Sequence, residues 1–244
     1  MKRAAILVVG LLVAGVCSRL GLWQLQRLDD RNERNRRAEQ QLARPALPLD
    51  PMAASDVVAD PDAYRFRPAV ATGRFDLTRE LVVIARAHRG VPGVHVVTPL
   101  VLDDSLAVLV ERGWLPSPDG RTVQPPLAPE PPQATVEGVL LLVDGRSGAI
   151  AAADSWPRRV MSPDPELVGP WYPYRLLPLL LRRRAPPEGS GLRSVDIPAL
   201  SGGPHLSYAM QWFGFAAIAL VGSLVFFVRR GDDTPGEGPP PSPS

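Results

Sequence analysis

Four polar or aromatic side chains open an otherwise apolar stretch near the end of the chain. They are His205, Tyr208, Gln211 and Trp212, and no charged residue occurs from Leu206 to Val228. A histidine can bind a metal or exchange a proton near neutral pH, whereas tyrosine and tryptophan rings favour a membrane–water interface. The cluster therefore combines a side chain capable of chemistry with neighbours suited to the edge of a bilayer.

A second cluster of this kind ends the apolar stretch at the other terminus, with Trp23, Gln24 and Arg27 in the segment "GLWQLQR". If the basic residues at the two chain ends lie at one depth in an antiparallel helix pair, Gln24 lies beside Tyr208 and Arg27 beside His205. Both clusters then share one membrane surface.

Two transmembrane helices are needed to position these clusters, and we expect them over residues 4–25 and 206–228. The second segment reaches roughly 35 Å at the helical rise, which is enough to cross a bilayer core of ~30 Å. The first follows a basic start and could equally be the core of a cleaved signal peptide. Val16 is too large for the expected cleavage site, and directly before Cys17 it also disfavours lipid attachment, so we interpret the segment as an uncleaved anchor.

Small residues recur at helical spacing on both segments, which predicts that the two helices pack against each other in lipid. On the first segment they are Gly10, Ala14, Ser18 and Gly21; on the second, Ala209, Ala216, Ala219 and Ser223 follow this spacing together with Trp212. Glycine and alanine are also common in any membrane helix, so a merely incidental pattern is the alternative.

Charge and composition limit the functional classes. The net charge is only +2, and the arginines follow no recognisable nucleic-acid-binding motif, so no nucleic-acid partner is expected. Basic residues occur on both sides of the first helix, so the positive-inside rule does not settle the topology. The only cysteine is Cys17, which leaves the domain between the helices without a disulfide or a thiol nucleophile.

Between the helices, residues 30–200 read as one β-rich domain. Short β-branched runs separated by turn residues predict an antiparallel sheet or a small barrel, with strands at 66–71, 81–87, 94–102, 106–112 and 135–142. Residues 116–132 are proline-rich and are expected to form a surface loop, and residues 231–244 a disordered tail. The fold class is thus a membrane-anchored α+β protein, in which two transmembrane helices flank a mainly antiparallel β domain.

Sequence motifs give no support for an enzyme. No zinc-site spacing, "GxSxG" elbow, phosphate loop or dinucleotide fingerprint occurs. His88 and His95 flank the turn "RGVPG" and are interpreted as hairpin-edge or partly buried histidines rather than ligands. Asp103 and Asp104 are interpreted as turn residues.

Five blocks in order along the chain resemble the Surfeit locus protein 1 family, whose members are membrane proteins that assist assembly of cytochrome c oxidase. The blocks are "GLWQLQR" (21–27), "GRFD" (73–76), "GVPGVHVVTPL" (90–100), "VLVERGWLP" (108–116) and "HLSYAMQWFGFA" (205–216). The resemblance implies a two-pass protein of the bacterial plasma membrane, with both termini cytoplasmic and an extracytoplasmic domain. Its expected partners are membrane lipid, oxidase subunit I, and the machinery of haem a synthesis or assembly.

The resemblance also implies a cofactor, haem a, which the protein would deliver to subunit I or stabilise there. The histidine proposed to bind the haem iron corresponds to His205, and Arg27 would lie near the propionates. Gln24, Tyr208 and Trp212 complete the expected site. Alternatively, His205 sits at the interface bonded to Gln24 or lipid, and the protein is an anchored scaffold that binds oxidase subunits without any cofactor. Trp114 could serve as a surface anchor for such a scaffold, although a core position is the better default.

Overall fold

The computed structural model describes residues 2–123, 127–128, 130–143, 156–198 and 200–229. The chain divides into two compact units. One contains residues 1–35 and 201–244, which include the apolar helices, and the other contains residues 36–200. Each unit is described separately.

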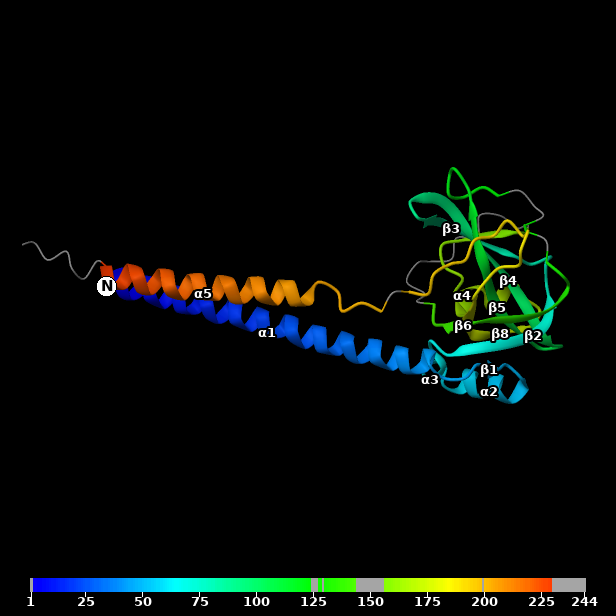
Figure 1. Ribbon diagram of the computed structural model, residues 1–244, viewed down its shortest axis with the longest axis horizontal. Coiled ribbons are helices and arrows are strands. Elements are labelled where there is room, and N and C mark those ends of the chain that lie inside the picture. The colour runs from blue at the N-terminus through cyan, green and yellow to red at the C-terminus, as the bar shows by residue number, and fades with distance from the viewer. Residues whose placement is uncertain (1, 124–126, 129, 144–155, 199, 230–244) are drawn as a thin grey trace, which may run out of the picture. The chain divides into compact units, whose positions relative to one another are not determined.

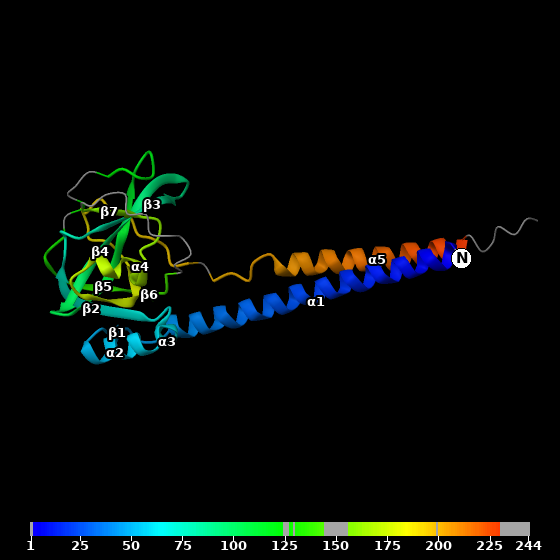
Figure 2. The same cartoon turned by 180° about the vertical axis from the view of Figure 1, so that it is seen from behind.

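The first unit is a pair of antiparallel helices. Helix α1 spans Lys2–Leu42 and helix α5 spans His205–Arg229, and they lie side by side over the apolar part of α1 (Figures 1 and 2). Both are long and apolar enough to cross a membrane, over Ala4–Leu42 and His205–Val228. The structure therefore contains the two apolar helices expected from the sequence.

Small residues form the contact between these helices. Ala14 and Ala216 are 4% and 5% exposed and pack together with Cys17. Gly10 allows the closest approach, because a Cβ atom at this position would lie 2.4 Å from the Cβ of Ser223. This packing confirms the predicted pairing of the small-residue faces.

The second unit is built on one eight-stranded sheet. Its strands are β1 (Leu47–Pro48), β2 (Pro68–Phe75), β3 (Leu81–His88), β4 (Val91–Asp103), β5 (Leu106–Pro116), β6 (Gln133–Leu141), β7 (Arg158–Val160) and β8 (Arg175–Arg183). The order is β1-β2-β6-β8-β5-β4-β3-β7, and β2 also pairs with β4. This extra pairing closes β2, β6, β8, β5 and β4 into a small barrel, which β3 and β7 extend.

The prediction of a mainly antiparallel sheet is wrong, because the sheet is mixed. Parallel pairing joins β1 to β2, β3 to β7 and β5 to β8. Strand β8 has the sequence "RLLPLLLRR" and lies between β5 and β6. A strand covered on both faces shows a continuous apolar run instead of polar–apolar alternation. This strand therefore lacks the alternating signal that indicated the antiparallel hairpins.

Barrel closure depends on a close backbone approach at Gly73. In the closing pair, Arg74 lies opposite Val101 and Phe75 opposite Leu100. A Cβ atom at Gly73 would come within 2.3 Å of the carbonyl oxygen of Val101, so any side chain here would push the two strands apart.

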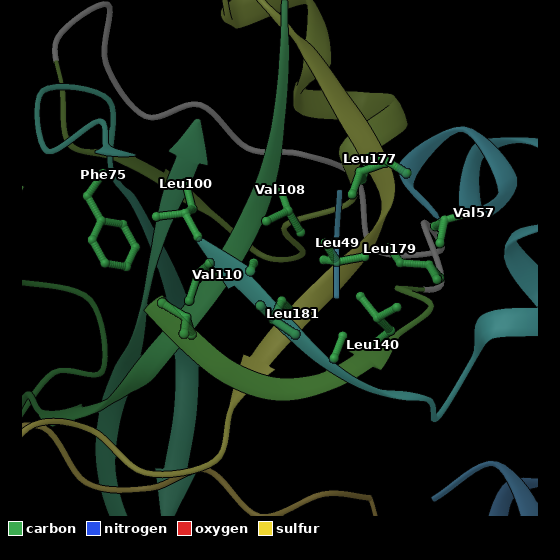
Figure 3. Packing of buried hydrophobic residues seen from close by; sticks show 14 residues of the cluster. Leu49, Val57, Phe75, Leu100, Val108, Val110, Leu140, Leu177, Leu179 and Leu181 are labelled. Atoms are coloured by element: carbon green, nitrogen blue, oxygen red, sulfur yellow. The ribbon is translucent and has the colours of Figure 1, made fainter. Parts of the chain in front are cut away.

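The barrel encloses the main hydrophobic core, which Figure 3 shows from close by. Buried apolar side chains come from all five closed strands, among them Leu100, Val110 and Leu181. Helix α2 (Pro51–Ala59) adds Val57 to this cluster and is capped by the carboxylate of Asp50. Short helical turns complete the unit: α3 (Pro61–Tyr64), α4 (Pro165–Val168) and the 3-10 turn η1 (Gly169–Trp171).

The proline-rich segment 116–132 differs from the expected surface loop. Of its described residues, Leu127, Ala128 and Glu130 are all less than 10% exposed. Part of this segment therefore packs into the domain. The tail predicted for residues 231–244 lies outside the described residues.

Candidate functional site

His205 is the first residue of α5 and bonds directly to the facing helix. Its Nδ1 atom lies 2.9 Å from Oε1 of Gln24 on α1, and the ring is partly buried. The antiparallel arrangement of the two helices brings these residues together across 181 positions of sequence. The first turn of α5 and the seventh turn of α1 thus share a polar contact at the end of an apolar interface.

The bond to Gln24 determines which imidazole nitrogen is available. An amide oxygen only accepts, so in the neutral ring Nδ1 carries the proton and donates it to Gln24. The Nε2 atom then keeps its lone pair. His205 is therefore oriented as a metal-ligating histidine is, with one nitrogen held by an acceptor and the other open.

The other predicted site residues lie around this pair. Tyr208 and Trp212 follow His205 at three and seven positions, which places them on one side of α5; Tyr208 is 47% exposed. The guanidinium of Arg27 lies 5.8 Å from the ring centroid of Trp23 in its own helix. Gln24 rather than Arg27 therefore contacts His205, because the guanidinium of Arg27 lies over the ring of Trp23, one helical turn earlier.

Sequence reasoning missed Arg31 as a neighbour of this cluster. Its Nε atom donates to the carbonyl of Ser201 over 2.7 Å. A Cβ atom at Gly203 would lie 3.8 Å from Arg31 and 3.5 Å from the His205 ring, so both side chains border Gly203. Arg31 lies four residues after Arg27. This spacing places both guanidinium groups on one helix face and was the sequence signal that could have identified Arg31.

The second unit holds a largely buried ion network that the sequence did not reveal. Arg112 is 0% exposed; it donates from Nη1 to Glu80 over 2.7 Å and from Nε to Glu130 over 3.3 Å. Arg183 bonds the other oxygen of Glu130 over 2.6 Å. Burial raises the pKa of Glu80, even though Thr98 and Arg112 both donate to it. The positive charges of Arg112 and Arg183 thus balance the negative charges of Glu80 and Glu130.

A second polar cluster joins His95, Glu111 and Arg182. Glu111 is 3% exposed; its Oε1 atom lies 2.5 Å from Nδ1 of His95, and its Oε2 atom accepts from Nε of Arg182. Burial alone would raise the pKa of Glu111, but the bonds from His95 and Arg182 outweigh it and hold the pKa below its usual value. The turn at Asp103 gives a sequence signal for this cluster, because a hairpin there brings His95 and Glu111 onto neighbouring strands.

The remaining histidine has an aromatic partner. The ring of His88 lies 5.3 Å from that of Trp114, and the guanidinium of Arg193 lies 5.4 Å from the same indole. Trp114 is 1% exposed, which confirms its core position. Within the described part of the chain, no three His, Cys, Asp or Glu side chains converge to hold a metal ion.

The His205–Gln24 pair, the two polar clusters of the β-rich unit and the barrel all lie within a segment that matches a known family. The model of the SURF1 family matches residues 11–217, which is most of the chain. The chain belongs to the SURF1 family. The resemblance inferred from the five sequence blocks is thereby confirmed.

Relatives of this SURF1-family protein occur in bacteria and in a eukaryote. Uncharacterised SURF1-like proteins of Mycobacterium bovis and Mycobacterium tuberculosis are each 29% identical over 233 residues, covering 92% of this chain and 84% of theirs. A SURF1-like protein of Monosiga brevicollis is 28% identical over 251 residues, covering 91% and 87%. The SURF1 family is generally known for cytochrome oxidase assembly factors and is not a known enzyme family. The mycobacterial relatives indicate a bacterial origin.

Proposed function

We propose that this SURF1-family protein binds haem a and delivers it to subunit I of cytochrome c oxidase, or stabilises it there. The observation that carries the proposal is the bond between Nδ1 of His205 and Gln24. It orients the ring and leaves Nε2 free at the end of an apolar helix pair. A neutral imidazole of this kind is a common axial ligand of haem iron.

The surrounding residues fit an amphipathic macrocycle. Tyr208 and Trp212 offer aromatic surface on the same side of α5 as His205. Arg27 and Arg31 supply guanidinium groups, which suit the planar carboxylates of haem propionates. His205 would therefore hold the iron and Arg27 a propionate, while the apolar helix faces would cover the ring. When bound, the group would supply the redox-active iron that the oxidase requires.

The proposal places the protein in the plasma membrane of a bacterium. Two candidate spans put both termini on one side, which we assign to the cytoplasm, with residues 30–200 outside. Its partners would be oxidase subunit I, the haem a synthesis or assembly machinery, and membrane lipid. Reporter fusions at residues 120 and 240 should give opposite locations, and identical locations would contradict the two-span arrangement.

Haem binding is tested by purifying the full chain from membranes that make haem a. We expect a haem a spectrum from the unchanged protein and a sharply reduced haem content from His205→Ala. His88→Gln is the matched control, because His88 belongs to the β-rich unit, and it should leave the haem content unchanged. Equal yields and helix content of the variants would show that the loss is specific.

A second outcome would favour a different function. If His205→Ala kept the full haem content and spectrum, the ligand assignment would be wrong. A scaffold that binds oxidase subunits without a cofactor would then account better for the two-unit structure. Co-purification of subunit I with His205→Ala would support that scaffold.

A further inference from the structure

The β-rich unit contains a cavity of about 320 Å³ beside the His95–Glu111–Arg182 cluster. Its polar lining comes from Arg86, His95, Glu111, Ser162 and Arg182, and its apolar lining includes Val83 and Leu180. The volume is near the lower end of the range for small-molecule sites, roughly 300–1,000 Å³. The cavity lies entirely within one unit and is independent of the helix cluster around His205.

Strand β3 is distorted where it borders this cavity. Val83 and Arg86 both line the cavity, although residues three apart on a regular strand face opposite sides. A register shift between these two residues accounts for the change of side. Ala85 within the shift has φ of 57°, a conformation that is strained for alanine. Bulges of this kind re-aim side chains next to functional sites.

The charges of the described residues that line the cavity do not cancel, unlike those of the Arg112 network. Glu111 is the only carboxylate among the described lining residues, and both of its oxygens are engaged by His95 and Arg182. Arg86 and Arg182 supply two positive charges against this one, a surplus even with a neutral His95. Arg86 and Arg182 are both partly buried beside apolar walls, where a bound anion would offset the cost of desolvating their charges.

Both arginines keep donors available for such an anion. Arg86 uses one Nη atom for the carbonyl of Met161, 2.8 Å away. Arg182 uses Nε for Glu111 and Nη1 for the carbonyl of Asp196. A guanidinium group carries five N–H donors, so each arginine is held in place while several of its donors have no partner among the described residues. This arrangement presents fixed positive donors rather than mobile surface charges.

We infer that this cavity binds a small organic anion. Its acidic group lies against Arg86 and Arg182, and its apolar part lies against Val83 and Leu180. A carboxylate and a phosphate share the acceptor chemistry that arginine recognises, and the apolar walls favour a carboxylate with a short hydrocarbon tail. The site is a second binding function of the protein, separate from the proposed haem site.

Calorimetric titration of the purified full chain in detergent tests this inference, with butyrate, inorganic phosphate and butylammonium as probes. Butyrate should bind saturably and phosphate more weakly, whereas butylammonium, with the same tail and the opposite charge, should not bind. Phosphate binding more tightly than butyrate would contradict the assignment of the apolar wall. Lack of saturation by either anion at concentrations on the order of 10 mM would overturn the inference.

Two variants locate the binding. Arg86→Gln removes a cation that bonds the backbone carbonyl of Met161, and it should weaken butyrate binding about tenfold or more. Ser162→Leu, at a position 5% exposed, should fill the cavity without changing charge and weaken binding similarly. Arg175→Gln, at an exposed position on β8, is the matched control and should bind as the unchanged protein does. Unaltered binding in both cavity variants would place the anion elsewhere and refute the site.

Discussion

Nη1 of Arg112 donates to Oε1 of Glu80 over 2.7 Å at a position where the arginine side chain is 0% exposed. The same guanidinium reaches the carboxylate of Glu130 and the carbonyl of Ala128 in the proline-rich segment. The arginine on β5 thereby joins Glu80, directly before β3, to Ala128 and Glu130, which belong to no helix or strand. Because the side chain is 0% exposed, its charge depends on these carboxylates for balance.

Removing Arg112 should therefore destabilise the β-rich unit strongly. We expect Arg112→Met to lower the free energy of unfolding by about 3–5 kcal/mol, since Glu80 stays buried without its arginine partner and Glu130 keeps only Arg183. Adding Glu80→Gln should restore part of the loss. Denaturant unfolding of the full chain in detergent, followed by tryptophan fluorescence, measures both. Arg175→Met, at an exposed arginine, is the control and should stay within about 0.5 kcal/mol of the unchanged protein.

The helix pair should respond to leucine according to the face that carries it. Ala14→Leu or Ala216→Leu should weaken helix pairing by on the order of 1 kcal/mol or more, because the larger side chain separates the backbones. Val9→Leu and Ile218→Leu are the controls, at positions 58% and 69% exposed. Energy transfer between fluorophores on the two helices during an SDS titration reports the pairing. Equal midpoints for all four variants would show that the contact face is assigned wrongly.

Local sequence patterns predicted much of the fold. The five expected strands correspond to β2 to β6, because turn residues bound them and their apolar residues are β-branched. Asp103 accepts from the backbone N–H of Ser105, which confirms the predicted turn. Strand β8 was missed because its continuous apolar run lacks alternation, and the parallel β5–β8 pairing joins residues too distant for any turn signal.

The candidate sites were predictable only in part. The antiparallel register predicted that the end of the first apolar stretch approaches His205, but it placed Arg27 beside His205 and Gln24 beside Tyr208. In the structure Gln24, about one helical turn before Arg27, bonds to His205 instead. The partners of Arg112 come from β3 and from the proline-rich segment. No periodic pattern marks such contacts, because they depend on which side chains meet after the barrel closes.

Acid should weaken the His95–Glu111–Arg182 cluster. The pKa of Glu111 lies below its ordinary value of 4.5 in the folded protein, so between the two values the unfolded chain binds more protons. The stability contributed by the carboxylate is present above pH 4.5 and is lost as the pH falls through the lowered pKa. Urea unfolding across this range should show that the advantage of the unchanged protein over Glu111→Gln shrinks with acidification.

A second variant separates the causes of this pH dependence. His95→Gln removes the bond that lowers the pKa of Glu111 most, so burial should then dominate and the loss of stability should begin at higher pH. If His95→Gln lost stability at the same pH as the unchanged protein, Arg182 alone would hold the carboxylate of Glu111 ionised. Because His95→Gln is expected to change the stability of the β-rich unit, it is not a neutral control for haem binding.

Gln24 should act as a positioning residue for His205 if the proposed haem site is correct. Gln24→Leu removes the acceptor at Nδ1, which frees the ring to rotate or to change tautomer, and should lower haem affinity roughly 10- to 100-fold. Gln24→Glu retains an acceptor and should restore binding, with a shifted absorption maximum because a carboxylate makes the imidazole a stronger donor to iron. Visible spectra of the purified variants distinguish these effects. If Gln24→Leu and Gln24→Glu gave the same haem content and spectrum, the contact would serve only helix packing.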